Sequence, residues 1–343
     1  MTGGPPGLDL DRLREYLDRV LPGATHGPLA ADLIGAGRSN LTYRVTDGDG
    51  CRLVLRRPPL GHVLATAHDM GREFRVLGAL RPTAVPVPDV LALCAEPDVL
   101  GAPFYLMAYV AGTVYRSAGD TTGLGPDRAY AIAYELTDTL VALHSVVPDA
   151  VGLADFGRPD GYLERQLRRW RTQLDASRSR PLPGIDELHA RLAERVPESG
   201  PATILHGDFR LDNVLVGAGD RIAAVLDWEM STLGDPLADL GLFLVYWELP
   251  GLLPTAGLVA GAVRAEAGFP AGSELAAYYA DRRGVEAVRL PWYVGLGYFK
   301  LAVIVEGIHY RFIGGQTVGA GFDRIGELTP TLVELGHRAL AEE

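Results

Sequence analysis

The chain has 343 residues, of which 48% are hydrophobic and 22% charged, as expected for a globular protein with a large buried core. Its formal net charge of −11 argues against a nucleic-acid partner, because binding to nucleic acid depends on basic surfaces. Cysteine occurs only as Cys51 and Cys94, and no uncharged apolar run reaches the roughly 18 residues of a membrane span. We therefore expect a cytoplasmic protein without disulfides and without a membrane segment.

The first third of the chain is predicted to form a tail and a β-rich lobe. Residues 1–28 begin with a Gly- and Pro-rich stretch that lacks the features of a signal peptide, followed by an amphipathic helix over Leu8–Val20. A second helix is predicted over Ala65–Leu80 from its apolar spacing. Residues 29–111 then form a lobe with five strands, predicted at Leu29–Ala36, Leu41–Thr46, Arg52–Arg57, Pro86–Leu93 and Phe104–Tyr109.

Residues 112–343 are predicted to form a mostly helical lobe. One short hairpin interrupts it, with strands at Val214–Val216 and Ile222–Leu226 joined by a Gly-rich turn. Helices are predicted at Pro126–His144, Gly161–Ala176, Ile185–Val196, Leu237–Tyr246, Thr255–Ala267, Gly272–Arg282, Pro291–Phe312 and Arg324–Ala341.

The hairpin is flanked by three residues whose chemistry suits phosphoryl transfer. The segment His206-Gly207-Asp208-Phe209-Arg210-Leu211-Asp212-Asn213 precedes it, and Asp227-Trp228-Glu229 follows fourteen residues later. One carboxylate, Asp208, can take the proton of an acceptor hydroxyl. The oxygens of Asn213 and Asp227 are hard ligands of the kind that Mg²⁺ prefers, and the hairpin would bring them to the same end of the strand pair.

A different interpretation applies to such residues when they stand alone. A buried Asp and a buried Asn can simply cap ordinary turns. The complete H-G-D-x-x-x-x-N pattern, with Asp227 placed after an apolar strand, favours the catalytic interpretation. No G-x-S-x-G, H-E-x-x-H or Walker lysine motif is present, which removes the usual hydrolase, zinc-protease and P-loop alternatives.

These motifs resemble those of the aminoglycoside phosphotransferase and choline kinase family. His206-Gly207-Asp208 stands where protein kinases have His-Arg-Asp, and Asp227-Trp228-Glu229 stands where they have Asp-Phe-Gly. The resemblance implies an α+β, protein-kinase-like bilobed fold, with an antiparallel β N-lobe that carries one helix and a mostly α-helical C-lobe. It also implies ATP and Mg²⁺ as cofactors, with Asp208 catalytic and with Asn213 and Asp227 binding the metal.

The same resemblance implies where the nucleotide binds in the N-lobe. Residues 35–40 lie between two strands and suit a phosphate-covering flap that includes Ser39 and Asn40, although an ordinary hairpin loop remains the alternative. The family places a lysine where Arg56 stands, and a guanidinium can bind phosphate as well. Glu73 on the following helix is the expected ion-pair partner of Arg56. Its neighbour Arg57 points to the other face of the strand and is expected to be exposed.

The remaining expectations concern the hinge between the lobes and the support of the catalytic loop. Backbone groups of Ala108 and Val110 would contact the adenine edge. His206 is expected to hold the loop through a backbone carbonyl, and Asp239 to accept backbone N–H groups from it. His144 is expected to be structural. Lysine occurs only once, as Lys300, against 31 arginines, which a GC-rich codon bias explains.

The sequence therefore predicts a phosphotransferase that acts on the hydroxyl of a small organic molecule, as a monomer or homodimer. Within the family, the fingerprints Ser39-Asn40-Leu41-Thr42-Tyr43 and Leu226-Asp227-Trp228-Glu229 look most like the branch that is fused to acyl-CoA dehydrogenases. A hydroxyacyl compound or another metabolic alcohol is as good a substrate candidate as an antibiotic. A non-catalytic nucleotide- or acyl-binding module that retains the fold is the alternative, supported by the replacement of the usual lysine by Arg56.

Overall fold

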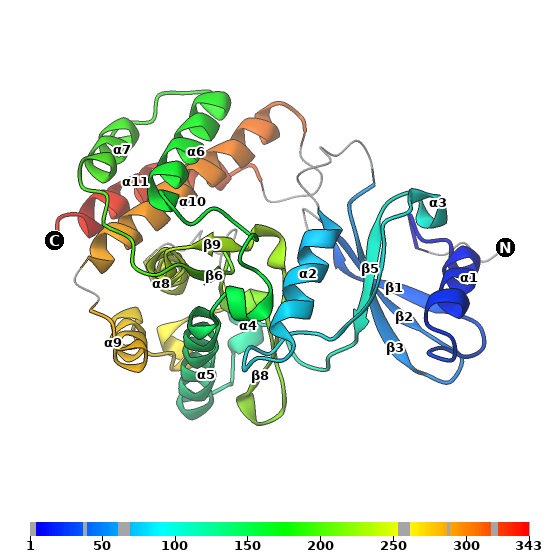
Figure 1. Cartoon of the computed structure of the whole chain (residues 1–343). Helices are drawn as coiled ribbons and strands as arrows, with labels where there is room; N and C mark the ends of the chain where they lie inside the picture. The colour runs from blue at the N-terminus through cyan, green and yellow to red at the C-terminus, as the bar shows by residue number, and fades with distance from the viewer. Residues whose placement is uncertain are drawn as a thin grey trace. The chain divides into compact units, whose positions relative to one another are not determined.

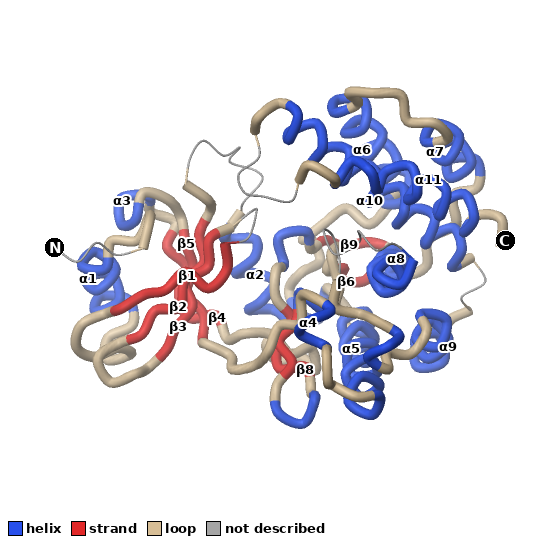
Figure 2. The backbone as a smooth tube through the Cα atoms, turned by 180° about the vertical axis from the view of Figure 1, so that it is seen from behind, coloured by secondary structure: helices blue, strands red, loops and turns tan. Residues whose placement is uncertain are grey.

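The computed structural model of the chain divides into two compact units, which we describe separately (Figures 1 and 2). Unit 1 comprises Met1–Gly112 together with Ala223–Glu229, and unit 2 comprises Thr113–Ile222 together with Met230–Glu343. The residues that the structure describes are 5–36, 40–60, 69–252, 261–286, 289–316 and 322–342.

Unit 1 is built on a five-stranded antiparallel sheet with the strand order β1-β2-β3-β5-β4. The turn between the second and third strands forms locally, because the Asp47 carboxylate accepts the backbone N–H groups of Asp49 (3.0 Å) and Cys51 (2.8 Å). The strands are β1 (Ala30–Ala36), β2 (Leu41–Thr46), β3 (Arg52–Arg57), β4 (Val90–Cys94) and β5 (Phe104–Ala108).

Three helices belong to unit 1, namely α1 (Leu10–Val20), α2 (Met70–Leu80) and α3 (Pro97–Leu100). α1 begins after Asp9, whose carboxylate accepts two backbone N–H groups of the first turn. Its apolar side buries Leu13 and Tyr16, and the ring of Tyr16 meets that of Phe104 edge-on, 5.2 Å away. α2 lies between β3 and β4 in the chain, where the sequence predicts the inserted helix.

Unit 2 is mostly helical. Its helices are α4 (Ala118–Thr121), α5 (Pro126–Ser145), α6 (Tyr162–Ser177), α7 (Ile185–Glu194), α8 (Pro236–Leu252), α9 (Gly272–Arg283), α10 (Leu290–Ile313) and α11 (Leu328–Ala339). Buried side chains of α6, α7, α8, α10 and α11 form one core. α8 is apolar on nearly every face because it lies inside this core.

Short elements connect these helices. β6 (Thr203–Leu205) pairs with β9 (Thr232–Gly234), and β7 (Val214–Val216) pairs with β8 (Ile222–Val225), in which the chain passes into unit 1. The 3₁₀ turns are η1 (Asp149–Val151), η2 (Leu211–Asn213), η3 (Ala218–Asp220), η4 (Trp228–Met230), η6 (Ala265–Ala267) and η7 (Ile325–Glu327). None of the described helices is long and apolar enough to cross a membrane.

Two expectations about local structure were wrong. The helix predicted over Thr255–Ala267 lies partly outside the described residues, but residues 261–264 are not helical and 265–267 form only the turn η6. Gly268 ends this segment with φ +91°, a left-handed conformation that stops a helix. Arg57 is only 4% exposed rather than solvated, because its guanidinium donates to the carbonyl oxygens of Gly7 and Leu100, the latter at 2.9 Å.

Candidate active site

The loop that carries Asp208 is held by its backbone. Asp239 near the start of α8 accepts the N–H groups of His206 at 2.6 Å and Gly207 at 2.9 Å, which confirms the expected role of Asp239. Gly207 has φ +84°, and a Cβ atom at this position would lie 2.6 Å from the carbonyl oxygen of Met230. Only glycine fits at this position, and it allows the backbone to pass close to Met230 just before Asp208.

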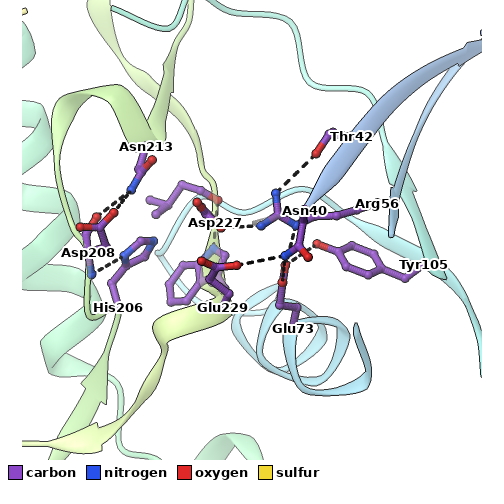
Figure 3. Close-up of polar contacts among 12 residues, drawn as sticks. Asn40, Thr42, Arg56, Glu73, Tyr105, His206, Asp208, Asn213, Asp227 and Glu229 are labelled. Carbon is purple, nitrogen blue, oxygen red and sulfur yellow. Dashed lines mark hydrogen bonds and ion pairs between the residues drawn. The ribbon is translucent and has the colours of Figure 1, made fainter. Parts of the chain in front are cut away.

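Asp208 and Asn213 are brought together by a loop that ends in the 3₁₀ turn η2. The Asn213 Nδ2 atom donates to the carbonyl oxygen of Asp208 at 2.8 Å and to its carboxylate Oδ2 at 2.9 Å (Figure 3). These two bonds fix the amide so that its oxygen, Oδ1, points away from Asp208. The carboxylate of Asp208 remains 27% exposed and can therefore meet a substrate.

Two further side chains of unit 2 lie beside Asp208. Arg210 Nε is 3.4 Å from Asp208 Oδ2 and 3.1 Å from Asp212 Oδ1, and its guanidinium stacks over the ring of Tyr246 at 4.9 Å. Burial raises the pKa of Tyr246 well above its usual range, and the neighbouring Asp208 carboxylate adds to the shift. His206 Nδ1 accepts the N–H group of Asp208 at 3.2 Å. The expected contact of His206 with a backbone carbonyl stays a prediction.

Unit 1 contains a second group of polar side chains, centred on Arg56 (Figure 3). Arg56 Nε lies 2.8 Å from Glu73 Oε2, and another nitrogen of the guanidinium pairs with Asp227 Oδ1. Burial by itself would lower the pKa of Arg56, but Glu73, Tyr105 and Asp227 raise it above its ordinary value. The ion pair between Arg56 and Glu73 that the sequence predicts is thus present, and Arg56 is always charged.

Glu73 on α2 receives donors from strands β3 and β5 and from the residue just before β2. Besides Arg56, the hydroxyl of Tyr105 donates to its carboxylate at 3.0 Å and Asn40 Nδ2 at 3.1 Å. The same Asn40 nitrogen donates to Glu229 Oε2, also at 3.1 Å. Asn40 is 1% exposed, so its amide links the two carboxylates inside the unit instead of projecting into solvent.

Asp227 itself has an uncommon backbone. Its φ of +64° lies in the left-handed region, which costs energy for a residue other than glycine. Trp228, 1% exposed, anchors the turn through a hydrogen bond from its indole Nε1 to the carbonyl oxygen of Val225 at 3.0 Å. The carboxylate of Asp227 remains 32% exposed. A strained backbone that keeps one carboxylate accessible is typical of functional positions.

Three further residues of the N-lobe, Ser39, Ala108 and Val110, are expected to contact the nucleotide. Ser39 lies outside the described residues. The N–H group of Ala108 donates to the carbonyl oxygen of Asp89 at 2.8 Å, so only the carbonyl of Ala108 could serve an adenine edge. Val110 follows the end of β5 and is half-buried.

The donor chemistry of Asn213 and Asp227 fits a magnesium ion. Within the described parts of the chain, no group of three or more His, Cys, Asp and Glu side chains forms a metal site. Mg²⁺ does not need one, since it is commonly held by one or two protein oxygens together with phosphate oxygens and water. The fixed amide of Asn213 and the accessible carboxylate of Asp227 supply such oxygens, each within its own unit.

Sequence reasoning missed several residues around these groups. Tyr105 and Glu229 join the cluster at Glu73, Arg210 lies within the loop that carries Asp208, and Lys300 lies beside that loop. A usable signal existed for two of them. Glu229 is the last residue of the Asp-Trp-Glu motif, and Lys300 is the only lysine of the chain.

The fold and these residues define a protein-kinase-like phosphotransferase. A family model described as the phosphotransferase enzyme family matches residues 31–278, and the chain belongs to this family. Acyl-CoA dehydrogenase family member 10 of Mus musculus is 35% identical over 327 residues, which cover 95% of this chain. The match covers 30% of the mouse protein, so the chain spans less than a third of that relative.

Solved structures agree with this assignment. A protein of Ralstonia eutropha, described as a candidate aminoglycoside phosphotransferase, is 31% identical with a TM-score of 0.84, and the match covers 97% of this chain and 98% of that one. Aminoglycoside phosphotransferase APH(4)-Ia, in a ternary complex with AMP-PNP and hygromycin B, has a TM-score of 0.61 at 17% identity, over 96% of this chain and 99% of that one. At this identity the second likeness shows the fold alone.

Proposed function

We propose that the protein transfers the γ-phosphate of ATP to a hydroxyl group of a small organic molecule, in a reaction that depends on Mg²⁺. The observation that carries the proposal is the catalytic loop, where Asn213 and Arg210 hold the partly exposed Asp208 carboxylate. Asp208 orients the acceptor hydroxyl and takes its proton. The nucleotide complex of the structural relative APH(4)-Ia supports ATP as the donor.

Arg56 and Glu73 would position the phosphates. Arg56 is held by Glu73 at 2.8 Å and also pairs with Asp227. Its contact with Asp227 would be exchanged for phosphate oxygens when the nucleotide binds, because one guanidinium can serve either acceptor. A Mg²⁺ ion bound by Asn213 and Asp227 would neutralise charge on the β- and γ-phosphates. The carbonyl of Ala108 and the backbone of Val110 would contact the adenine, and Ser39 would belong to the flap over the phosphates.

Unit 2 has a small hollow that would receive only part of the acceptor. The hollow is lined by Arg210 and Asp212 from the catalytic loop, by Phe243 and Trp247 of α8, and by Val263. Its walls are mainly aromatic and aliphatic, which suits an acceptor with an apolar part. The mouse relative is named as an acyl-CoA dehydrogenase family member, which supports a hydroxyacyl compound as one candidate, beside the aminoglycosides that the Ralstonia name suggests.

The proposal is tested by a transfer assay. Purified protein is incubated with γ-labelled ATP and Mg²⁺ and a panel of alcohols that includes kanamycin, hygromycin B, hydroxy acids and hydroxyacyl thioesters. We expect transfer to at least one acceptor and none with the Asp208→Asn variant. Nucleotide binding without transfer to any acceptor, and without phosphate release to water, would contradict the proposal and favour the non-catalytic binding module.

A further inference from the structure

The only lysine of the chain contacts the catalytic loop. Lys300 lies in the middle of α10, and its Nζ atom donates to the carbonyl oxygen of Gly207 at 2.8 Å. The ammonium group also lies over the ring of Trp170, 5.4 Å from the ring centre. The chain has arginine at 31 positions and lysine only at this one.

With this contact, both backbone polar groups of Gly207 are hydrogen-bonded. Asp239 accepts the N–H group of Gly207 at 2.9 Å, and Lys300 binds the carbonyl on the other side. This carbonyl belongs to the peptide bond that leads directly into Asp208, whose own N–H group donates to His206 at 3.2 Å. Because the peptide is planar, holding its oxygen also sets the direction in which the Asp208 Cα atom leaves the loop.

The charges agree with this geometry. Burial lowers the pKa of the Lys300 ammonium, and the carboxylates of Asp208 and Asp239 oppose that shift. Asp208 and Asp239 therefore stabilise the charged form of Lys300. A compact ammonium fits a single carbonyl acceptor in this space, whereas a planar guanidinium would need room for five N–H donors.

We propose that Lys300 is a positioning residue of the phosphotransfer site, which fixes the Gly207 carbonyl and thereby aims the carboxylate of Asp208. The proposal rests on the proposed role of Asp208 as the acceptor-activating group.

The first test compares Lys300→Met and Lys300→Arg with Val303→Ala, which removes buried volume from the same helix. The probe is MgATP alone, with phosphate release to water as the rate. We expect Lys300→Met to lower this rate by about 10²-fold, as expected for a misaligned catalytic group. Nucleotide affinity should stay unchanged, because Arg56 and Glu73, the residues proposed to position the phosphates, lie in unit 1. Lys300→Arg keeps a donor and should recover part of the rate.

The second test does not depend on activity. Hydrogen exchange at the amides of His206 and Gly207 should become faster in Lys300→Met than in Val303→Ala at equal global stability. In protein labelled with [¹³Cε]lysine, Lys300 supplies the single side-chain signal. Its titration midpoint should fall in Asp208→Asn, because the lysine loses an anionic neighbour. Asp220→Asn, an identical change at a turn of unit 2 where the carboxylate pairs with Arg128, should leave the midpoint unchanged.

The outcomes separate this proposal from the proposed function. Equal rates and equal amide exchange in Lys300→Met and Val303→Ala, or an unchanged midpoint in Asp208→Asn, would overturn the positioning role. Absence of phosphate release in the unmodified protein would count against the proposed function, and the exchange and titration measurements would then still decide whether Lys300 holds the loop.

Discussion

At the scale of single residues, a substitution of Asp208 should lower turnover without weakening nucleotide binding. Asp208→Asn keeps the size of the side chain and the contact with Asn213 but removes the carboxylate that we propose takes the acceptor proton. We expect turnover to fall by about 10²–10⁴-fold, the usual contribution of a general base, with little change in nucleotide affinity. Asp220→Asn is the matched control. An equal loss of nucleotide binding would identify Asp208 as a metal-binding or structural residue instead.

Asp227 should govern the metal dependence of nucleotide binding. Asp227→Ala removes an anionic oxygen that a hard cation needs and also takes a carboxylate away from Arg56. We expect nucleotide affinity in the presence of Mg²⁺ to fall strongly, while affinity without the metal changes little. Titration of ATP with and without Mg²⁺ measures both. A variant that keeps the full difference between the two titrations would show that Asp227 does not bind the ion.

Arg56 stands at the position where the family usually has a lysine. Arg56→Ala should lower kcat/KM by about 10-fold or more, because a charge-assisted phosphate contact is worth ~1.5–3 kcal/mol. Arg56→Lys should restore only part, since an ammonium cannot contact Glu73 and a second acceptor as a fork. Arg57→Ala is the contrast, because Arg57 bonds to backbone carbonyls in the interior. Arg57→Ala should lower the melting temperature rather than nucleotide affinity. If instead Arg57→Ala lowered nucleotide affinity and Arg56→Ala did not, Arg57 would be the residue that contacts phosphate.

At the scale of elements, helix α2 is tied to the sheet by one carboxylate. Glu73 accepts from Arg56, Tyr105 and Asn40, which lie on or next to three different strands. Glu73→Ala would leave these donors buried without their acceptor, and removing one partner of a buried ion pair costs ~3–5 kcal/mol. Urea unfolding measures this loss. Glu15→Ala on the exposed side of α1 is the control and should change stability by less than ~0.5 kcal/mol.

The same arrangement explains why the Asp-Trp-Glu segment belongs with the sheet of unit 1. Residues 223–229 interrupt the helical unit in the chain but contribute to the compact unit of the β-sheet. Asp227 pairs with Arg56 of β3, and Glu229 with Asn40 just before β2. The backbone at Val225 also donates to the carbonyl oxygen of Pro86 at 2.8 Å. The segment that carries Asp227 is thus anchored beside Arg56.

At the scale of the whole molecule, unit 2 should lose stability in mild acid because of His144. His144 is 1% exposed, and its ring lies 2.7 Å from the hydroxyl of Tyr279 on α9 and 3.5 Å from Asp239 on α8. Burial lowers the pKa of His144, although Asp239 opposes the shift. The unfolded chain therefore binds a proton first as the pH falls below about 6.5, and the free energy of unfolding decreases.

Denaturant unfolding between pH 8 and pH 5 measures this effect. We expect the free energy of unfolding to decrease towards pH 5 in the unmodified chain and to decrease less in His144→Gln, which cannot titrate. His26→Gln, at an exposed position of unit 1, should keep the slope of the unmodified chain. An unchanged slope in His144→Gln would show that another group controls the acid sensitivity.

The sequence by itself determined the features that depend on neighbouring residues. The strands Leu41–Thr46 and Arg52–Arg57 begin and end where predicted, because their turn is stabilised by its own Asp47. The contact between Asp208 and Asn213 is equally local, since only four residues separate the two in the chain. The kinase-like order of strands and helices followed from such local patterns, because each hairpin and each amphipathic helix is specified by residues close in the chain.

Only the tertiary structure decided what surrounds these motifs. Glu73 meets Tyr105 and Asn40 more than thirty residues away, and Lys300 reaches Gly207 across 93 residues. Arg57 is buried because it finds carbonyl acceptors at Gly7 and Leu100, although the strand pattern predicts exposure. No periodicity encodes such partners. They depend on how elements distant in sequence pack together, and a buried polar group is tolerated only where that packing supplies its hydrogen bond.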